Sequence, residues 1–247
     1  MAMETFASAS DLHGDMQDKS AVRAFLKFVS EFKPKKRIFK GDIWDFRAIR
    51  SGADADEKEH SMLKDFDAGM AFLDAYRPHV ITLGNHDQRL FDLLSKGGVK
   101  KSGPLTDLAT LLVEKFQRKA KELRITVLPY TKRHGVWRYN GLAFAHGFFS
   151  GKNAATQMAR VYGDVLFGHG HAIDVSTEPG QRTRTARMTG ALCLLDMDYN
   201  RAQTTTLRQQ HGWAYGAFLS RNRNAIFQAD VQHGQAVYAG SLNVIQA

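Results

Sequence analysis

Five short clusters of carboxylate, imidazole and amide side chains could do chemistry in this sequence, and each follows an apolar run and touches a glycine. In chain order they are Asp11 and His13 in SDLHGD, Asp42 and Asp45 in KGDIWD, Asn85, His86 and Asp87 in LGNHD, His146 in AFAHG, and His169 and His171 in FGHGH. Taken singly, such a cluster is more often a turn or a structural histidine than a set of ligands. Five in succession favour one site at the carboxyl ends of strands, where open α/β sheets bind ligands.

The donor types in these clusters are those of a metal centre. Imidazole, carboxylate and amide donors without thiolates suit zinc, manganese or iron, and do not suit a structural zinc site of the cysteine type. Seven potential ligands exceed what one tetrahedral ion needs. Two ions that share a carboxylate therefore fit the number of donors better than one ion does.

In this order the clusters resemble the signature of the calcineurin-like metallophosphoesterases, which is Asp-x-His, Gly-Asp-x-x-Asp, Gly-Asn-His-Asp or Glu, a single His, and Gly-His-x-His. The match spans residues 11–171, roughly two thirds of the chain. The resemblance implies a hydrolase of phosphate esters that uses two divalent ions. It assigns one ion to Asp11, His13, Asp42 and His171, and the other to Asn85, His146 and His169, with Asp42 bridging both.

The resemblance also implies roles for the remaining residues. His86 is the expected catalytic histidine, which binds no metal, and Asp87 is expected to orient it. Asp45 is expected to be an outer carboxylate that holds a metal-bound histidine. In the implied mechanism a metal-bound hydroxide attacks the phosphate in line and His86 protonates the leaving oxygen. Mn²⁺ is the favoured ion, with Fe, Zn, Ni or Co as alternatives.

One departure from the family pattern concerns the substrate. Members that act on phosphoproteins usually carry arginine directly after the last aspartate of the second motif, whereas this chain has Phe46 there and Arg47 one position later. This weakens an assignment as a phosphoprotein phosphatase. Arg47 and Arg89 are the candidate substrate-binding residues. Trp44 could line the cleft and stack on a base, but core packing is the favoured interpretation.

Apolar periodicity predicts the elements that must position these clusters. Strands are expected at 4–10, in RIFKGD, HVITL and ITVLPY, on both sides of the Asn-Gly turn in GVWRYNGLAFAHG, at 165–167, 172–176, 184–189 and 191–197, and in the hairpin GWAYGAFLSRNRNAIFQADV. Helices are expected from Val22 to Phe32, at 61–76 and at 105–124, with a loop or short helix over 88–104.

Helix and strand alternate early in the chain and strands dominate late. This order predicts an α/β (α+β) fold, a four-layer α/β/β/α sandwich of two mixed sheets flanked by helices, with the active site at the carboxyl ends of strands. We expect a single domain over 1–247, with a helical insertion around 88–124 and a C-terminal β-hairpin extension around 211–247.

Composition bounds the class of protein. The 247 residues are 43% hydrophobic, enough for a substantial core, and the one cysteine, Cys193, excludes an internal disulfide and is expected in that core. The N-terminal residues lack the pattern of a signal peptide, and no apolar run approaches the roughly 20 residues that span a bilayer. We therefore expect a cytoplasmic protein with no membrane partner.

The net charge of +9 favours polyanionic partners. Basic residues gather in KPKKR at 33–37, on the outer face of the 105–124 helix and in QRTRTAR at 181–187. These segments lie beside the motifs in sequence, so some could line a groove that follows a nucleic-acid backbone, or they could be solvated surface. Trp213 and Tyr215 could offer a stacking surface for bases, although core packing is the safer interpretation.

The leading hypothesis is a two-metal phosphodiesterase that acts on nucleic acid or nucleotides. A phosphomonoesterase for small metabolites is an alternative with the same chemistry. A nucleic-acid-binding module that has lost catalysis is an alternative of a different class. The complete signature, with His86 in place, argues against the inactive module.

Overall fold

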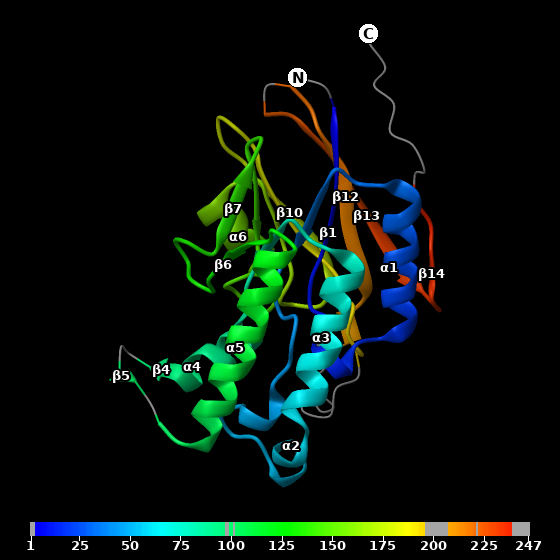
Figure 1. Ribbon diagram of the computed structural model, residues 1–247. Coiled ribbons are helices and arrows are strands. Elements are labelled where there is room, and N and C mark those ends of the chain that lie inside the picture. The colour runs from blue at the N-terminus through cyan, green and yellow to red at the C-terminus, as the bar shows by residue number, and fades with distance from the viewer. Residues whose placement is uncertain (1–2, 97–98, 101, 196–206, 221, 239–247) are drawn as a thin grey trace.

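The computed structural model describes residues 3–96, 99–100, 102–195, 207–220 and 222–238, and in them two β-sheets pack face to face between helices (Figure 1). The larger sheet has the strand order β14-β13-β12-β1-β2-β3-β6. Its strands are β1 (Glu4–Ala9), β2 (Lys36–Phe39), β3 (Val80–Thr82), β6 (Thr126–Leu128), β12 (His211–Phe218), β13 (Asn224–Gln232) and β14 (Gln235–Ala236). Strands β1, β2, β3 and β6 run parallel to one another, and β12 pairs antiparallel with β1.

The smaller sheet has the order β10-β11-β9-β8-β7. Its strands are β7 (Val136–Tyr139), β8 (Leu142–Ala145), β9 (Val165–Phe167), β10 (Ile173–Glu178) and β11 (Arg184–Thr189). The three central strands, β8, β9 and β11, are parallel, and the two edge strands are antiparallel to their neighbours. A separate short pair joins β4 (Ser95–Lys96) to β5 (Val99–Lys100).

Helices cover the outer faces of both sheets (Figure 1). They are α1 (Lys19–Phe32), α2 (Ala55–Glu59), α3 (Met62–Tyr76), α4 (Asn85–Leu94), α5 (Pro104–Glu122) and α6 (Ala154–Tyr162), with 3-10 turns η1 (Gly14–Met16) and η2 (Arg47–Ile49). Helix α1 begins after Asp18, whose carboxylate accepts from the backbone N–H groups of Ser20 and Ala21 and so caps the first turn. Within the described ranges, no helix combines the length and the apolar character that crossing a bilayer requires.

Alternating side chains explain why the layers stack as they do, because successive residues of a strand point to opposite faces of the sheet. On β1, Phe6 points between the sheets and packs on Phe144 of β8 and Phe218 of β12, at centroid distances of 5.7 and 4.7 Å. Its neighbour Ala7 belongs to the apolar cluster that lies under α1 and α3. On the other side of the molecule, Met158 of α6 packs with the outer face of the smaller sheet. The predicted α/β/β/α order of layers is confirmed.

The helix α4 begins earlier than the sequence suggests. A loop or short helix was expected only from residue 88, whereas Asn85 opens a helix for which Gly84 is the N-terminal cap. Asn85, His86 and Asp87 therefore project from one helical turn. Side chains on a first turn point in different directions, so the three residues can serve three different purposes.

Two further predictions need correction. No strand forms over 191–195, where Ala191 and Cys193 make isolated bridges, and residues 196 and 197 lie outside the described part of the chain. The C-terminal hairpin β12–β13 is present, but it is not an appended extension. Strand β12 pairs along β1 from Glu4↔Phe218 to Ser8↔Ala214, and so it lies within the larger sheet. Residues 239–247 lie outside the described ranges.

Candidate metal centre and active site

The five clusters meet where parallel strands of both sheets end. The side chains come from the segments after β1 (Asp11, His13), β2 (Asp42, Asp45), β3 (Asn85, His86), β8 (His146) and β9 (His169, His171). The backbone N–H of His169 donates to Asp11 Oδ1 at 3.0 Å, and His146 Nε2 lies 3.1 Å from Asp42 Oδ2. Because each of these contacts joins one sheet to the other, the site lies across both sheets.

The segments that carry the site have an unusual backbone. Five of the seven predicted ligands have φ between 52° and 70°, in the left-handed region that residues other than glycine rarely adopt. They are Asp11, His13, Asp42, His169 and His171. Hydrogen bonds between loops hold this conformation, for example from Asp11 N to Gly41 O and from His13 N to Asp42 O, both at 3.0 Å. Backbone strain of this kind persists only where the surroundings enforce it, and it concentrates at functional sites.

The first group of donors consists of Asp11, His13, Asp42 and His171. His13 Nε2 lies 3.2 Å from His171 Nε2, which in turn lies 3.4 Å from Asp11 Oδ1. Asp42 Oδ2 lies 3.8 Å from His13 Nε2. All four residues are buried, so their polar atoms are turned toward one another and away from bulk water.

The second group consists of Asn85, His146 and His169, again beside Asp42. Asn85 Oδ1 lies 2.9 Å from both His146 Nε2 and His169 Nδ1, and these two nitrogens are 3.3 Å apart. The same oxygen of Asp42 that faces His13 lies 3.1 Å from His146 Nε2. Asp42 thus stands between the two groups, which is the place that the sequence resemblance predicts for a bridging carboxylate.

These residues fit divalent metal ions. The donor atoms of Asp11, His13 and Asp42 lie within 4.8 Å of one another, and so do those of Asp42, His146 and His169. A ring nitrogen that faces another ring nitrogen at 3.2 or 3.3 Å gains little from it unless a cation or a proton lies between them. Imidazole and carboxylate donors that converge without thiolates match the preferences of first-row divalent ions.

Polar atoms from outside the two donor groups face the far nitrogens of three histidine rings. His146 Nδ1 donates to the carbonyl oxygen of Lys40 at 2.8 Å, which leaves Nε2 free of hydrogen toward the site in the neutral ring. Asp45 Oδ1 lies 3.6 Å from His13 Nδ1, near the ring but beyond hydrogen-bond distance. The third partner is Cys193, whose Sγ lies 3.7 Å from His171 Nδ1.

The contact of Cys193 was not predicted. The residue is fully buried, in agreement with the expectation of core packing, but it also reaches the site. No local signal marks it in the sequence, because its apolar neighbours in ALCLL resemble any buried segment. Tyr130 was missed for the same reason. Its ring lies edge-on to His146 at 5.8 Å, and its hydroxyl donates to Gly147 O.

His86 lies beside the donor groups with its ring held from behind. Its Nδ1 lies 2.7 Å from Asp45 Oδ1, so Nδ1–H donates to that carboxylate. Its Nε2 lies 3.3 Å from Arg89 Nη2 and 4.0 Å from Asp42 Oδ2. Arg89, one turn along α4, donates to both the carbonyl and the carboxylate of Asp45. His86 Nε2 is therefore the ring atom directed to the site.

Asp87 does not orient His86, contrary to the sequence prediction. It is buried, and its carboxylate accepts four hydrogen bonds from backbone N–H groups. The donors are Gly84 (2.8 Å), Asp42 (2.9 Å), Ile43 (2.9 Å) and Trp44 (3.2 Å). Asp87 thus fixes the loop after β2 to the start of α4, and Asp45 orients the imidazole in its place. Sequence proximity favoured Asp87, but the helical turn directs the two side chains apart.

Arg47 is not placed as the predicted substrate ligand would be. It is 6% exposed, and its guanidinium makes two hydrogen bonds to Asp15, at 2.7 and 2.9 Å, and one contact with His60 at 3.0 Å. These contacts tie the segment after β1 to the segment after β2. Arg89 remains a candidate substrate-binding residue because its guanidinium lies beside His86 Nε2. Trp44 packs in the core as expected, stacked on Phe66 at 5.2 Å.

Two glycines allow the segments to approach so closely. A Cβ atom on Gly84 would lie 2.1 Å from Asp42 Oδ1, and one on Gly168 would lie 2.3 Å from Asp11 Oδ2. Both distances are far below any real contact of a Cβ atom. Gly84 therefore permits a close approach of the backbone, because any side chain there would displace the central carboxylate.

Electrostatics keep the carboxylates in the form that binds cations. Burial works to raise the pKa of Asp42, but the neighbouring imidazoles, His146 first, hold it well below its usual range. Burial also works to raise the pKa of Asp11, but the hydrogen bond and the charge of His171 outweigh it and lower that pKa to about 2. Burial alone would lower the pKa of His146, whereas the Asp42 carboxylate outweighs it and raises that pKa to about 9. Burial and the adjacent His146 lower the pKa of His169 to about 4, so this ring is neutral.

Two of the three basic segments, KPKKR and QRTRTAR, lie at the strand ends opposite the site and so do not line a groove beside it. KPKKR leads into β2, and QRTRTAR spans the turn before β11 and the strand itself. Both segments therefore reach the amino ends of the strands, whereas the site lies at the carboxyl ends. Trp213 and Tyr215 offer no stacking surface, since they are buried at 0% and 3% exposure.

Comparison with known proteins gives a likeness of fold. No protein-family profile and no curated protein matches the chain. Vacuolar protein sorting 29 from Cryptosporidium parvum matches with a TM-score of 0.50 and 13% identity over 96% of each chain. An archaeal phosphodiesterase matches with a TM-score of 0.47 and 11% identity, over 92% of this chain and 99% of that one. The phosphoesterase YfcE from E. coli matches at 0.40 and 11%, over 91% and 97%.

Proposed function

We propose that this chain, which has the fold of the calcineurin-like metallophosphoesterases, hydrolyses phosphate esters with two divalent metal ions. The observation that carries the proposal is the position of Asp42, whose Oδ2 faces His13 of one donor group and His146 of the other. One ion would be held by Asp11, His13, Asp42 and His171, and the other by Asp42, Asn85, His146 and His169. We favour Mn²⁺, with Fe, Zn, Ni or Co as alternatives that the same donors accept.

When bound, the two ions would supply the positive charge that holds an anionic phosphate and activates water for in-line displacement. The chain's own contribution begins with the fixed orientation of the donors. Lys40 O, Asp45 and Cys193 each face the far nitrogen of a histidine ring, so the near nitrogen is directed into the site. Burial of Asp11 and Asp42 excludes competing water from the two carboxylates.

His86 would act as the general acid. Asp45 accepts the hydrogen bond from Nδ1–H, so Nε2 is the atom that would carry a proton to the departing oxygen of the ester. Arg89 lies beside Nε2, where a guanidinium can bind a phosphate oxygen and bring the leaving group to the imidazole. The assignment of His86 as a catalytic residue and Arg89 as a substrate contact is part of the proposal.

The substrate class that we favour is a phosphodiester of nucleic acid or nucleotides. The support is the net charge of +9, which raises the local concentration of polyanions around the chain. A phosphomonoesterase for small metabolites is the alternative within the same chemistry. The cytoplasmic location stays a prediction, based on the single cysteine.

A role without catalysis is the second candidate, and one observation favours it. The C. parvum protein with this fold is named for vacuolar sorting and not for hydrolysis, and a fold by itself does not decide function. Against this candidate stands the arrangement of His86, Asp45 and Arg89, which a binding module does not need.

The experiment that tests the proposal replaces His86 and varies the leaving group. His86→Ala is compared with His134→Ala, which changes an exposed histidine on the loop after β6. Turnover is measured with Mn²⁺ on single-stranded DNA, bis-p-nitrophenyl phosphate and p-nitrophenyl phosphate, and bound metal is quantified. We expect His86→Ala to retain its metal and to lose roughly 10²–10⁴-fold on DNA, whose alkoxide leaves poorly, and less on the nitrophenyl esters.

The outcomes separate the candidates. Loss of metal in His86→Ala would show that His86 is a ligand and that its role is misassigned. Turnover of the monoester alone would overturn the diester preference. A wild-type chain that holds two ions and turns over none of the three substrates would favour the role without catalysis.

A further inference from the structure

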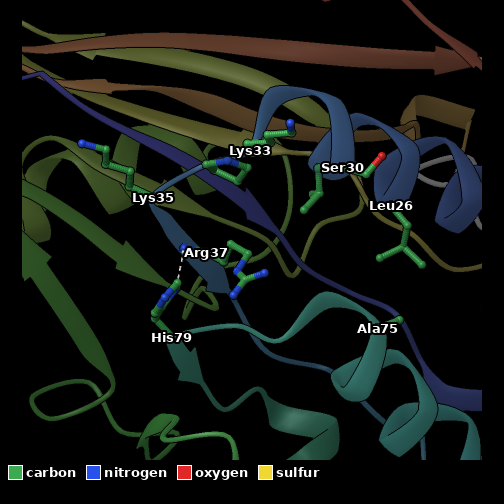
Figure 2. Close-up of a pocket in the computed structure, with 9 residues that line it drawn as sticks. Leu26, Ser30, Lys33, Lys35, Arg37, Ala75 and His79 are labelled. Carbon is green, nitrogen blue, oxygen red and sulfur yellow. Dashed lines mark hydrogen bonds between the residues drawn. The ribbon is translucent and has the colours of Figure 1, made fainter.

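A cleft of about 570 Å³ lies at the amino end of the larger sheet, between the C-terminal ends of α1 and α3. We call it the amino-end cleft and define it by Leu26, Val29, Lys33, Lys35, Arg37 and His79. Figure 2 shows Lys33, Lys35 and Arg37 around it, with Leu26 and Ala75 on the sides that the two helices form. No acidic residue lines the cleft, so its charged groups are all cationic.

The cleft is part of a row of cations that the strand order creates. His79 N donates to Arg37 O at 2.7 Å, and Thr126 N donates to His79 O at 2.9 Å, so the starts of β2, β3 and β6 lie side by side. A cation stands one to three residues before the start of each of these strands. These cations are Lys35, Arg77 and Arg124. Neighbouring strands are about 4.8 Å apart, so the row extends over roughly 10 Å.

Within the described part of the chain, five cations of the cleft and the row together have no carboxylate within 4.0 Å. They are Lys33, Lys35, Arg37, Arg77 and Arg124. Other cations at the same end are paired, since Lys36 lies 3.7 Å from Glu4 and Lys119 lies 2.9 Å from Asp74. The positive charge of the row is therefore not cancelled by acidic side chains that the structure describes.

Helix dipoles do not account for this charge either. Lys33 and Arg77 follow directly on the C-termini of α1 and α3, where a cation is stabilising. Each helix C-terminus carries about −0.5 of an elementary charge, so α1, α3 and α5 together offset about 1.5 charges. Five cations then leave an excess of about +3.5 at this end, which is enough to attract a polyanion.

Arg37 is partly buried. Its Nε is buried and has no hydrogen-bond partner among the described residues, which is costly for a charged group unless a ligand supplies the acceptor. Burial and the positive charges of Arg37 and Lys36 lower the pKa of His79. Its Nδ1 accepts from Arg37 N at 3.1 Å, so the neutral ring has one donor left, Nε2–H.

The cleft is remote from the metal centre. Arg37 stands at the start of β2 and Asp42 follows the end of that strand, a separation of roughly 16 Å along an extended chain. A single phosphate cannot contact both places. Whatever binds in the cleft is therefore bound by a second site and does not depend on metal.

We propose that the amino-end cleft binds the phosphate backbone of a nucleic acid. Arg37 holds one phosphate, and Lys35, Arg77 and Arg124 contact the next phosphates along the strand. A lone small anion would need only the cleft, whereas the row of cations continues beyond it across three strands. This inference does not rest on the proposed hydrolysis, because it concerns binding at the opposite end of the sheets.

The test measures binding without catalysis. A short fluorescein-labelled single strand of DNA is titrated with the EDTA-treated chain, and fluorescence anisotropy is followed from about 0.05 to 0.2 M salt. The variant Lys35→Gln, Arg77→Gln, Arg124→Gln removes three exposed charges of the row. The matched control, Lys58→Gln, Lys64→Gln, Lys152→Gln, removes three exposed charges elsewhere. Circular dichroism checks that both variants fold.

We expect the row variant to bind at least about tenfold more weakly and its salt slope to fall by about 2, since each lost contact to a single strand removes about 0.7. The control should keep the slope of the wild-type chain. Equal losses in both variants would mean a general effect of net charge and would overturn the proposal. So would unchanged binding in the row variant.

A second variant tests the cleft itself and the nature of the ligand. Arg37→Gln should weaken DNA binding, and inorganic phosphate should displace DNA only at high concentration. A different result would show that the ligand is a free phosphate and that the assignment to nucleic acid is wrong. In that case phosphate binds the wild-type chain tightly, Arg37→Gln abolishes this binding, and neither Arg37→Gln nor the row variant changes the affinity for DNA. With metal restored, the row variant should hydrolyse bis-p-nitrophenyl phosphate like the wild-type chain, so failure here is distinct from failure of the proposed function.

Discussion

Charged side chains are buried and in mutual contact at one end of the larger sheet, whereas at the other end they are exposed cations. At the carboxyl ends of the strands, Asp11, His13 and Asp42 are buried, in contact with one another and held in left-handed backbone conformations. At the amino ends, Lys35 and Arg77 are exposed and have no acidic partner among the described residues. The same strands β1, β2 and β3 connect the two regions.

This difference separates two kinds of recognition. Buried groups with several fixed partners can select one geometry, but each depends on its neighbours, so a single change affects all of them. Exposed cations select only the sign of a charge, and each contributes about the same small amount. We therefore expect steep, local effects of mutation at the carboxyl end and shallow, additive effects at the amino end.

The largest expected effect tests the carboxyl end. Asp42→Asn keeps the shape of the side chain and removes the charge that the two donor groups share. We expect turnover to fall by about a thousandfold or more, which corresponds to about 4 kcal/mol of transition-state stabilisation. Metal analysis should show fewer than two ions per chain. Two bound ions with full activity in Asp42→Asn would contradict the shared position of this carboxylate.

The second effect concerns stability. Asp87→Ala leaves four buried backbone N–H groups without their acceptor, so we expect the free energy of unfolding to fall by about 3 kcal/mol or more. Urea denaturation measures it. Asp67→Ala, at an exposed position of α3, is the control and should stay within about 0.5 kcal/mol of the wild-type chain. Similar stabilities of the two variants would mean that Asp87 does not hold the loop.

A smaller effect is expected at Cys193, which touches a candidate ligand from behind. Cys193→Ala leaves His171 Nδ1 without that partner. We expect the ion held by the donor group that contains His171 to bind about tenfold more weakly. Cys193→Ser keeps a polar atom there and should lose less. Metal titration followed by calorimetry compares them. Equal affinities in Ala, Ser and the wild-type chain would show that the sulfur only fills space.

The smallest effect is a shift of one pKa at the amino end. The pKa of His79 lies below its ordinary value of 6.5 in the free chain, because burial, Arg37 and Lys36 disfavour its protonated form. Its contribution to stability is therefore present above pH 6.5 and is lost as the pH falls through the lowered pKa. DNA bound in the cleft would bring negative charge and raise this pKa. NMR titration of the imidazole with and without DNA measures the change, and no upward shift would count against binding there.

The donors of the site could be found from the sequence because each motif is short. Asp11 and His13, or His169 and His171, are two residues apart in the loop that directly follows one strand, so the end of that strand brings both to the same edge of the sheet. The strands themselves were predicted from alternating apolar residues, and the layers follow from the same alternation. Where the pattern was weaker, as in ALCLL at 191–195, it predicted a strand that does not form.

Other features depended on contacts between distant segments. Asp45 and His86 are 41 positions apart, and no spacing rule indicates that their side chains meet at 2.7 Å. Asp87, the adjacent residue, was the natural choice to orient His86, yet the first turn of α4 directs it to backbone N–H groups. Arg47 was likewise a plausible ligand for phosphate until its bonds with Asp15 were seen.

The sequence by itself determined which side chains converge, because the chemistry of a ligand and its place at the end of a strand are local properties. Only the tertiary structure decided which partner orients His86, that Cys193 lies behind His171, and that KPKKR reaches the end of the molecule opposite Asp42. These facts arise from the direction of parallel strands and from the packing of two sheets. Neither is encoded in the spacing of neighbouring residues.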